Sequence, residues 1–248
     1  EYYLDVNQMT ELYHVFIEKK YPEDWDKDWR EHAHESLGLF LVQYLCNGFN
    51  LADAARLVYD DHYFKSGKKS FRFIRKKTED RSDTEIVIPI IEPLQKILDE
   101  IAAKPEKGAL VFPQIYAGET DENKQKARIS QENQNIRKRL GRLVKSMGWE
   151  VAPSGTWCRH SFATNLSHAG GVPKEYIQEA MGHSVMSGTV TDRYIQTYPL
   201  SRQIEFNSKL LQVGEQTDIM EELQNLSAEE LRAVIAMVKN RQNIGGME

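Results

Sequence analysis

The chain reads Arg159-His160-Ser161-Phe162-Ala163-Thr164, then Met181-Gly182-His183-Ser184, then Thr191-Asp192-Arg193-Tyr194. These segments bring, in a fixed order, a guanidinium, an imidazole and a phenol. A phosphodiester can be cut without a metal ion when a nucleophile is held in line, the charge on the phosphate oxygens is stabilised and a proton reaches the leaving oxygen. The three segments therefore indicate phosphoryl-transfer chemistry, and the rest of the chain is interpreted from them.

The ordered trio resembles the second box of the tyrosine recombinase (phage integrase) family. The family pattern is an Arg-His-(Ser/Thr)-Phe-Ala-Thr helix, a Leu/Met-Gly-His-Ser turn and a Tyr nucleophile. The resemblance covers about residues 1–210. It implies the DNA breaking-rejoining enzyme fold, which is mostly α with a small antiparallel β-sheet (α+β). It also implies the catalytic domain of a site-specific DNA recombinase or integrase, which cleaves and rejoins DNA through a covalent 3′-phosphotyrosyl intermediate.

The resemblance assigns roles to individual residues. Tyr194 is the expected nucleophile, with Tyr198 as a weaker alternative four residues later. Arg159 is expected to clamp the scissile phosphate, since a guanidinium offers two parallel donors and stays charged. His183 is expected to donate to a non-bridging oxygen. The proton for the leaving 5′-oxygen is expected from the lysine of Lys77-Thr78, with Lys76 as its rival.

Two positions depart from the family pattern. The first box normally reads Gly-Leu-Arg-x-x-Glu, whereas this chain reads Gly48-Phe49-Asn50-Leu51-Ala52-Asp53, so Asn50 stands where a phosphate-binding arginine belongs. Thr156 stands where His or Lys is usual. Loss of a charged clamp slows phosphoryl transfer by a few decades unless another cation replaces it, and Arg56 on the same helix is a candidate replacement. The alternative is a catalytically degraded relative that binds DNA or an assembly without cleaving.

Composition limits the class of protein. With 248 residues, 40% of them hydrophobic, the chain is long enough to bury a substantial core. It has no run of about 18 apolar residues, so we expect no membrane segment. Two cysteines, Cys46 and Cys158, make no disulfide framework and suggest a cytoplasmic protein. Cys158 and His160 are two residues apart on a helix and do not face each other, which argues against a thiol protease.

Charge is unevenly distributed. The net charge of −5 argues against DNA binding, but eight basic residues lie between Lys65 and Arg81 and eight more between Lys124 and Lys145. If the three motifs are disregarded, solvent-exposed faces of helices and of the hairpin explain these basic runs equally well. With the motifs, we expect contacts to the DNA backbone from six basic residues: Lys68, Lys69, Arg137, Lys138, Arg139 and Arg142.

Periodicity outlines the elements. Asn50 followed by Asp53 three residues on has the form of a capping box, which predicts a short helix over residues 51 to about 58. Alternating apolar residues at 71–73 and 86–90 predict a β-hairpin, and residues 110–112 a third strand. The polar stretch 113–130 is expected to be a loop. Apolar positions from Ile136 to Met147 predict a basic-backed helix before the motif helix.

The expected organisation is a catalytic domain at residues 1–213 and a C-terminal helical extension at 214–248. The chain begins with Glu1 and contains nothing resembling the core-binding domain that family members carry upstream. We therefore expect weak, salt-sensitive DNA binding by this chain. The expected partners are double-stranded DNA and a homotetramer assembled on it, with no cofactor and no metal, since no zinc-ligand spacing occurs. A helical protein-interaction module is a third reading, but it does not explain why Arg159, His183 and Tyr194 occur together.

Overall fold

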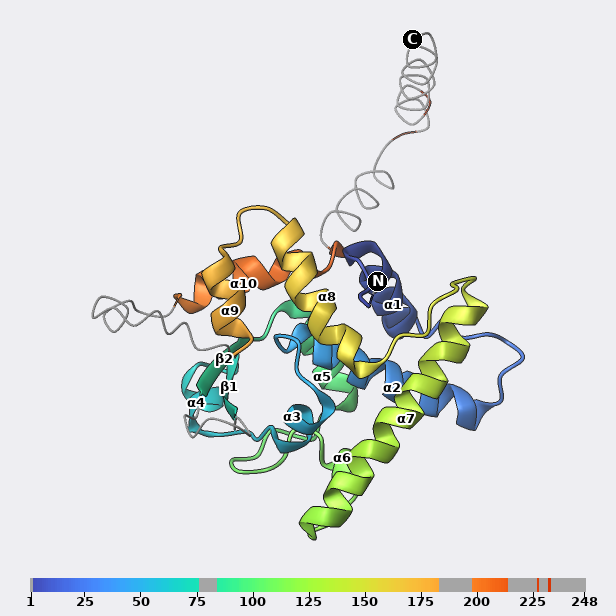
Figure 1. The fold of residues 1–248 in the computed structure, drawn as a ribbon, viewed down its shortest axis with the longest axis horizontal. Helices are drawn as coiled ribbons and strands as arrows, with labels where there is room; N and C mark the ends of the chain where they lie inside the picture. Colours follow the sequence, from blue (N-terminus) through green and yellow to red (C-terminus); the bar gives the residue numbers. More distant parts are fainter. Residues whose placement is uncertain (1, 76–83, 183–197, 214–226, 228–231, 233–248) are drawn as a thin grey trace. The chain divides into compact units, whose positions relative to one another are not determined.

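The structure, a computed structural model, describes residues 2–75, 84–182, 198–213, 227 and 232. Contacts within the chain divide it into two compact units, Glu1–Leu211 and Gln212–Glu248. The described part of the first unit is helical apart from one antiparallel hairpin (Figure 1). This confirms the predicted fold class.

The elements of the first unit are named as in Figure 1. Its described helices are α1 (Val6–Glu18), α2 (Lys27–Leu45), α3 (Leu51–Arg56), α4 (Asp61–Lys65), α5 (Glu92–Ile101), α6 (Pro113–Tyr116), α7 (Glu122–Ser146), α8 (Gly155–His168), α9 (Lys174–Ala180) and α10 (Leu200–Asn207). Its described strands are β1 (Ser70–Arg75) and β2 (Thr84–Pro89).

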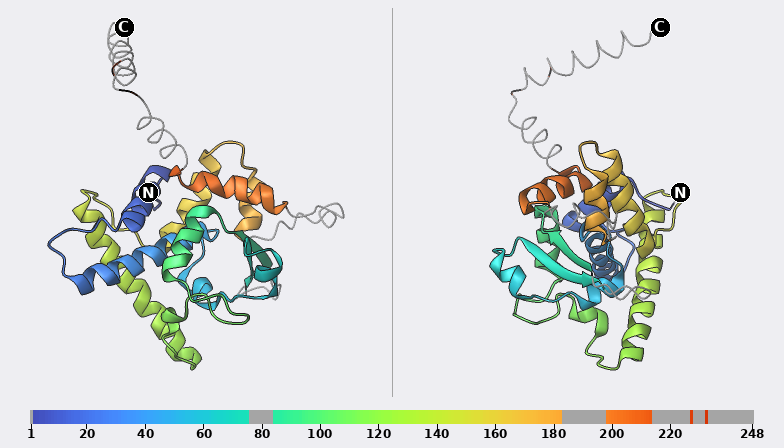
Figure 2. Two further views of the ribbon diagram at one scale, coloured as in Figure 1. Left: turned by 180° about the vertical axis from the view of Figure 1, so that it is seen from behind. Right: turned by 60° about the vertical axis from the view of Figure 1, so that its left-hand side comes forward.

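Helix α2 lies at the centre of the first unit. Every residue from Ser36 to Leu45 is buried. Helices α1, α5, α7 and α8 pack around it, as Figures 1 and 2 show. A helix covered on all sides needs no polar face, which is why the second half of α2 is almost uniformly apolar. Helix α8, which carries the first sequence motif, is thereby fixed against the core.

The hairpin matches its predicted pattern. Phe71 pairs with Ile88 and Phe73 with Ile86, and all four side chains are buried. Because successive strand residues point to opposite faces, this register puts the apolar residues on the face that packs inward. Strand β2 contacts α9 and α10, so the hairpin is held beside the C-terminal helices of the unit.

The predicted loop at residues 113–130 is wrong. Pro113 begins the short helix α6, and α7 begins at Glu122, with Asp121 as its N-cap accepting from Lys124 N. The first half of α7 has no wide apolar stripe because little of it is covered: its buried residues begin at Ile136. Most of its residues are good helix formers, so the helix extends beyond the region that periodicity could detect.

The predicted third strand is also wrong. Within the described residues, Leu110 forms only an isolated antiparallel bridge with Val58. Pro113 follows almost at once and starts α6, so the extended segment ends before a ladder can form. The described sheet therefore has two strands.

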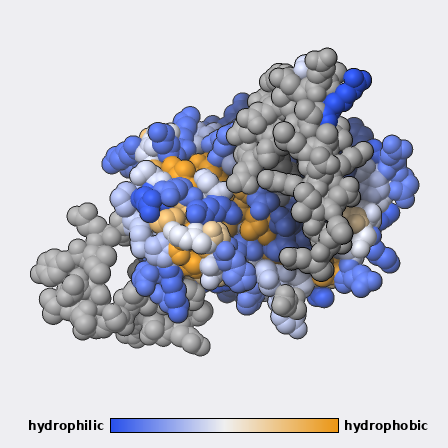
Figure 3. All heavy atoms as spheres, turned by 90° about the horizontal axis from the view of Figure 1, so that it is seen from above, coloured by the Kyte–Doolittle hydropathy of each residue, from blue (hydrophilic) through white to orange (hydrophobic). Residues whose placement is uncertain are grey.

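The surface drawn in Figure 3 is mostly hydrophilic, with hydrophobic residues showing only in small patches. The large apolar side chains exposed among the described residues are Tyr2, Phe64 and Ile74. No helix in the described ranges combines the length and apolar character needed to cross a bilayer.

Candidate active site

The turn between α2 and α3 brings the first box against α8. Gly48 has a φ of +67°, a left-handed conformation that favours glycine. A Cβ at this position would lie 3.0 Å from Arg159 Cα and 3.3 Å from Phe162 Cβ. The glycine therefore serves both the backbone turn and the close approach of the motif helix.

Arg159 lies where three segments meet. Its Nη1 donates to Gly48 O at 3.4 Å and its Nη2 to Met181 O at 3.1 Å. Met181, which accepts the second of these bonds, lies two residues before His183, at the end of α9. The guanidinium thus links the first box to the Met-Gly-His-Ser segment, which are far apart in sequence.

Four of the predicted catalytic residues lie outside the described residues: Lys76, Lys77, His183 and Tyr194. The described chain stops one residue before Lys76, at Arg75 of β1, and one residue before His183, at Gly182; it resumes at Thr84 and at Tyr198. Of the four-residue catalytic set, Arg159 is the member whose surroundings the structure describes.

Asn50 is the N-cap of α3. Its Oδ1 accepts from Asp53 N at 2.8 Å, and its backbone N–H donates to Asp53 Oδ2 at 3.4 Å. This is the capping box predicted from the sequence. The helix ends earlier than predicted, at Arg56, because Leu57 turns to an extended conformation.

Arg56 is engaged on its own helix. Its Nη2 pairs with Asp53 Oδ1 at 2.9 Å, and its Nε donates to Ala52 O at 3.2 Å. The guanidinium carbon lies 5.3 Å from the ring centroid of Phe73. Asp53 is almost fully buried. Arg56 therefore neutralises a buried carboxylate and covers an aromatic ring in this structure.

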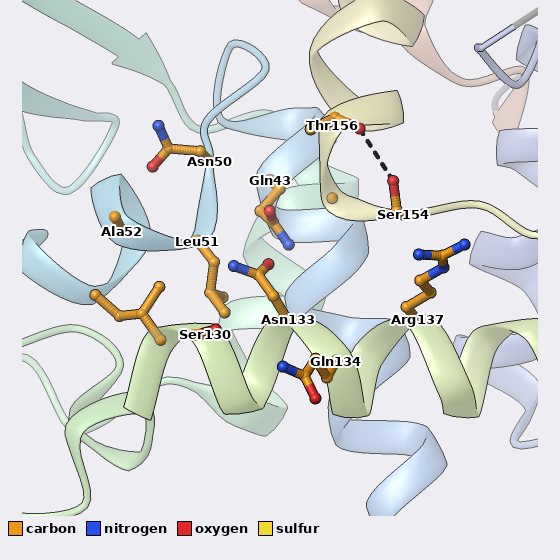
Figure 4. Close-up of a pocket in the computed structure, with 12 residues that line it drawn as sticks. Gln43, Asn50, Leu51, Ala52, Ser130, Asn133, Gln134, Arg137, Ser154 and Thr156 are labelled. Carbon is orange, nitrogen blue, oxygen red and sulfur yellow. Dashed lines mark hydrogen bonds between the residues drawn. The ribbon is translucent and has the colours of Figure 1, made fainter. Parts of the chain in front are cut away.

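Asn50 and Thr156, the two departures from the family pattern, line one groove. This groove has a volume of about 370 Å³ and lies between α3, α7 and the start of α8 (Figure 4). Arg137 of α7 also lines it. Thr156 Oγ1 is hydrogen-bonded to Ser154 Oγ at 3.0 Å. The structure thus brings together three of the residues selected from the sequence: Asn50, Thr156 and Arg137.

Residues 4–200 match the sequence model of the Phage integrase family. This chain belongs to the phage integrase family. No curated protein matches it in sequence. Solved structures that are similar to this chain include two recombinases and one integrase. One is the XerH site-specific recombinase bound to difH substrate in a pre-cleavage complex, with 15% identity, a TM-score of 0.45, and 84% of this chain and 50% of that chain covered.

The second is the integrase from mycobacterium phage Brujita, with 15% identity, a TM-score of 0.46, and 83% of this chain and 70% of that chain covered. The third is the XerA recombinase, with 16% identity, a TM-score of 0.36, and 76% of this chain and 65% of that chain covered. This phage integrase family chain thus spans half the length of the XerH chain.

The basic residues of α7 in this family member differ in what their side chains contact. Arg139 donates to Ser36 Oγ at 3.0 Å and lies 3.6 Å from Glu132 Oε1. The Arg142 guanidinium lies over Trp25 and Trp29, at 5.0 and 4.8 Å from their ring centroids. Lys138 Nζ lies 5.7 Å from the Trp29 ring. These three cations hold α7 to the first half of α2 and to the turn before it, a role that was not predicted from the sequence.

Lys68 and Lys69 lie in the exposed turn between α4 and β1. Neither side chain pairs with a described residue, whereas Arg72 on β1 pairs with Asp60 at 3.2 Å. Both lysines are therefore available to a partner molecule.

The cysteines are poor nucleophiles. Cys46 and Cys158 are free and fully buried, and burial raises the pKa of each thiol well above its usual range. Within the described ranges, no group of three or more His, Cys, Asp or Glu side chains is placed to hold a metal ion.

Proposed function

We propose that the chain is the catalytic domain of a site-specific DNA recombinase or integrase, acting on double-stranded DNA through a covalent phosphotyrosyl intermediate. Membership of the phage integrase family supports this proposal. The observation that carries it is the Arg159 guanidinium, which lies between the first-box turn and the residues just before His183. Arginine at such a junction can donate to one phosphate from two nitrogens.

The reaction conserves the energy of the broken bond. The Tyr194 phenol gives its proton to solvent as its oxygen attacks the phosphorus, a P–O bond to tyrosine forms, and the P–O bond to the 5′-oxygen breaks. Lys77, or its rival Lys76, gives the proton that makes this oxygen a 5′-hydroxyl. Attack by a 5′-hydroxyl on the phosphotyrosine reverses each change and rejoins the strand. Arg159 and His183 stabilise the charge on the non-bridging oxygens.

We further propose that the protein acts as a tetramer on DNA in the cytoplasm of its cell. Rejoining to a different partner strand requires several cleaved ends held together, which supports an oligomer on DNA. Two buried free thiols fit a reducing compartment. We also propose that the catalytic domain ends at residue 213 and that residues 214–248 form an extension separate from it.

Covalent capture tests the proposed function. The protein is incubated with a library of nicked duplexes of randomised sequence, and DNA linked to it after denaturation in detergent is recovered and sequenced. We expect wild-type protein and Tyr198→Phe to capture DNA and Tyr194→Phe to capture none. Tyr198 is a matched control because its ring packs against Tyr176 and Phe206, at 5.6 Å from each centroid. Capture that is lost in Tyr198→Phe and kept in Tyr194→Phe would contradict the assignment.

A second function is favoured by Asn50 and Thr156, which are neutral where the family has charged residues. A degraded relative would bind DNA without cutting it. Duplex binding with no covalent product in any library member, from wild-type protein, would establish this alternative.

A further inference from the structure

The groove between α3, α7 and α8 is polar but not acidic. Its described lining includes the carboxamides of Gln43, Asn50 and Asn133 and the hydroxyls of Ser154 and Thr156, and no carboxylate. Arg137 is the one charged side chain among these lining residues. A groove of this composition has no negatively charged side chain in its lining, and its amide and hydroxyl groups include hydrogen-bond donors.

Arg137 has no counter-ion among the described residues. It is exposed, and in Figure 4 its guanidinium points from α7 toward Ser154 at the start of α8. Arg139 and Arg142 on the same helix are occupied by Ser36 and by two tryptophan rings. The cation that α7 presents to this groove is therefore Arg137, and it is available for a charge-assisted hydrogen bond.

The start of α8 adds donors to the same groove. Its N-cap residue, Ser154, makes no side-chain hydrogen bond to the helix backbone, since its Oγ is bonded to Thr156 Oγ1. The first N–H groups of a helix carry partial positive charge and bind anions when no cap occupies them. Gly155 and Thr156, the first two residues of α8, line the groove.

The groove adjoins Arg159. Thr156 precedes Arg159 by three residues on α8, so the two lie on one side of the helix a turn apart. Gly48, whose carbonyl accepts from Arg159, is two residues before Asn50. The groove and the Arg159 guanidinium therefore share the same two elements, the first-box turn and the start of α8.

We propose that this groove binds the scissile phosphate from the side opposite α9, next to Arg159, with Arg137 as its second cation. The ligand is a phosphodiester of the DNA strand, so this inference rests on the proposed function. The neutral Asn50 and Thr156 shape the groove, and Arg137 supplies the charge from α7. Arg56, the candidate chosen from the sequence, is held by Asp53 and Phe73 instead.

Salt dependence tests the phosphate contact without requiring cleavage. Affinity for a duplex of random sequence is measured over a range of salt concentrations for wild-type protein, Arg137→Ala and Arg137→Lys. Each phosphate contact contributes about 0.9 to the slope of log K against log salt concentration. We expect Arg137→Ala to lower this slope by about that amount and Arg137→Lys to retain it. A slope in Arg137→Ala equal to that of the wild type would overturn the proposal.

Cleavage of a neutralised substrate tests where the phosphate lies. The scissile phosphate of a captured DNA site is replaced by a methylphosphonate, which lacks one charged oxygen. On the natural phosphodiester, we expect Arg137→Ala to cleave about 10²- to 10³-fold more slowly than wild type. On the methylphosphonate, we expect most of this difference to disappear. An equal loss on both substrates would overturn the placement of Arg137 at the scissile phosphate.

Arg128→Ala is the matched control for this comparison. Arg128 is an exposed arginine on α7 that does not line the groove. We expect Arg128→Ala to change the cleavage rate by the same factor on the phosphodiester and on the methylphosphonate. If wild-type protein forms no covalent product at all, the proposed function fails, and the salt dependence still decides whether Arg137 holds a phosphate.

Discussion

At the scale of single residues, Gly48 connects sequence to site most directly. Its left-handed backbone and the 3.0 Å from its virtual Cβ to Arg159 Cα both exclude a side chain. We expect Gly48→Ala to lower the free energy of unfolding by about 2 kcal/mol or more, through backbone strain and displacement of α8. Urea unfolding measures this change.

Gly108→Ala separates the two causes. Gly108 also has a positive φ, +81°, but a Cβ there would meet nothing within 4 Å. We expect this variant to lose only the backbone contribution, about 1 kcal/mol. Equal losses in the two variants would show that the contact with Arg159 adds nothing.

The residues of the candidate site differ in how far sequence could place them. The Asn50 cap was predictable because a capping box is local: both partners lie within four residues. The sequence could not predict that Arg137, and not its basic neighbours on α7, faces the groove. This depends on which face of α7 meets Trp25 and Trp29, more than a hundred residues earlier. Long cationic side chains are used for packing as readily as for ligand binding.

At the scale of elements, the contact between α7 and the start of α2 depends on an arginine that lies over two tryptophan rings. We expect Arg142→Ala to lower the free energy of unfolding by about 1 kcal/mol, from loss of the cation–π contacts and of the packed side-chain stem. Lys145→Ala, at an exposed position in the last turn of α7, is the control and should change it by less than about 0.5 kcal/mol. Indistinguishable unfolding of the two variants would contradict the packing role.

A second element-scale contact joins α5 to α2 and to the end of α1. Glu100 accepts from His34 Nε2 at 2.8 Å and lies 3.3 Å from Lys19 Nζ. Burial acts to raise the pKa of this carboxyl, but the bonds from His34 and Lys19 outweigh it, so its pKa is lowered in the folded protein. The stability that Glu100 contributes is therefore present above its unfolded pKa and is lost as pH falls through its folded pKa.

We expect Glu100→Gln to flatten the loss of stability on the acid side, below about pH 4.5. Urea midpoints measured from neutral pH down to about pH 3 provide the test. Glu106→Gln, at an exposed position without a described side-chain partner, should keep the wild-type pH dependence. If Glu100→Gln also keeps the wild-type dependence, the ion pair contributes nothing to acid stability.

At the scale of the whole molecule, side chains far apart in sequence close the first unit around α2. Tyr44 Oη donates to Leu210 O and accepts from Asn165 Nδ2, each at 2.8 Å. The sequence predicted the helical class and the hairpin because periodic burial is visible in a single chain. It missed the long exposed part of α7, which carries the groove-lining residues, because an uncovered polar helix leaves no apolar pattern.

The proposed function of the whole molecule depends on one covalent bond. The measurement that tests it most directly is mass spectrometry of the DNA-linked protein after nuclease and protease digestion, which locates the residue that carries the nucleotide remnant. We predict the remnant on the peptide containing Tyr194, attached to its phenolic oxygen. A remnant on any other residue, or binding of DNA with no remnant on any peptide, would contradict the account.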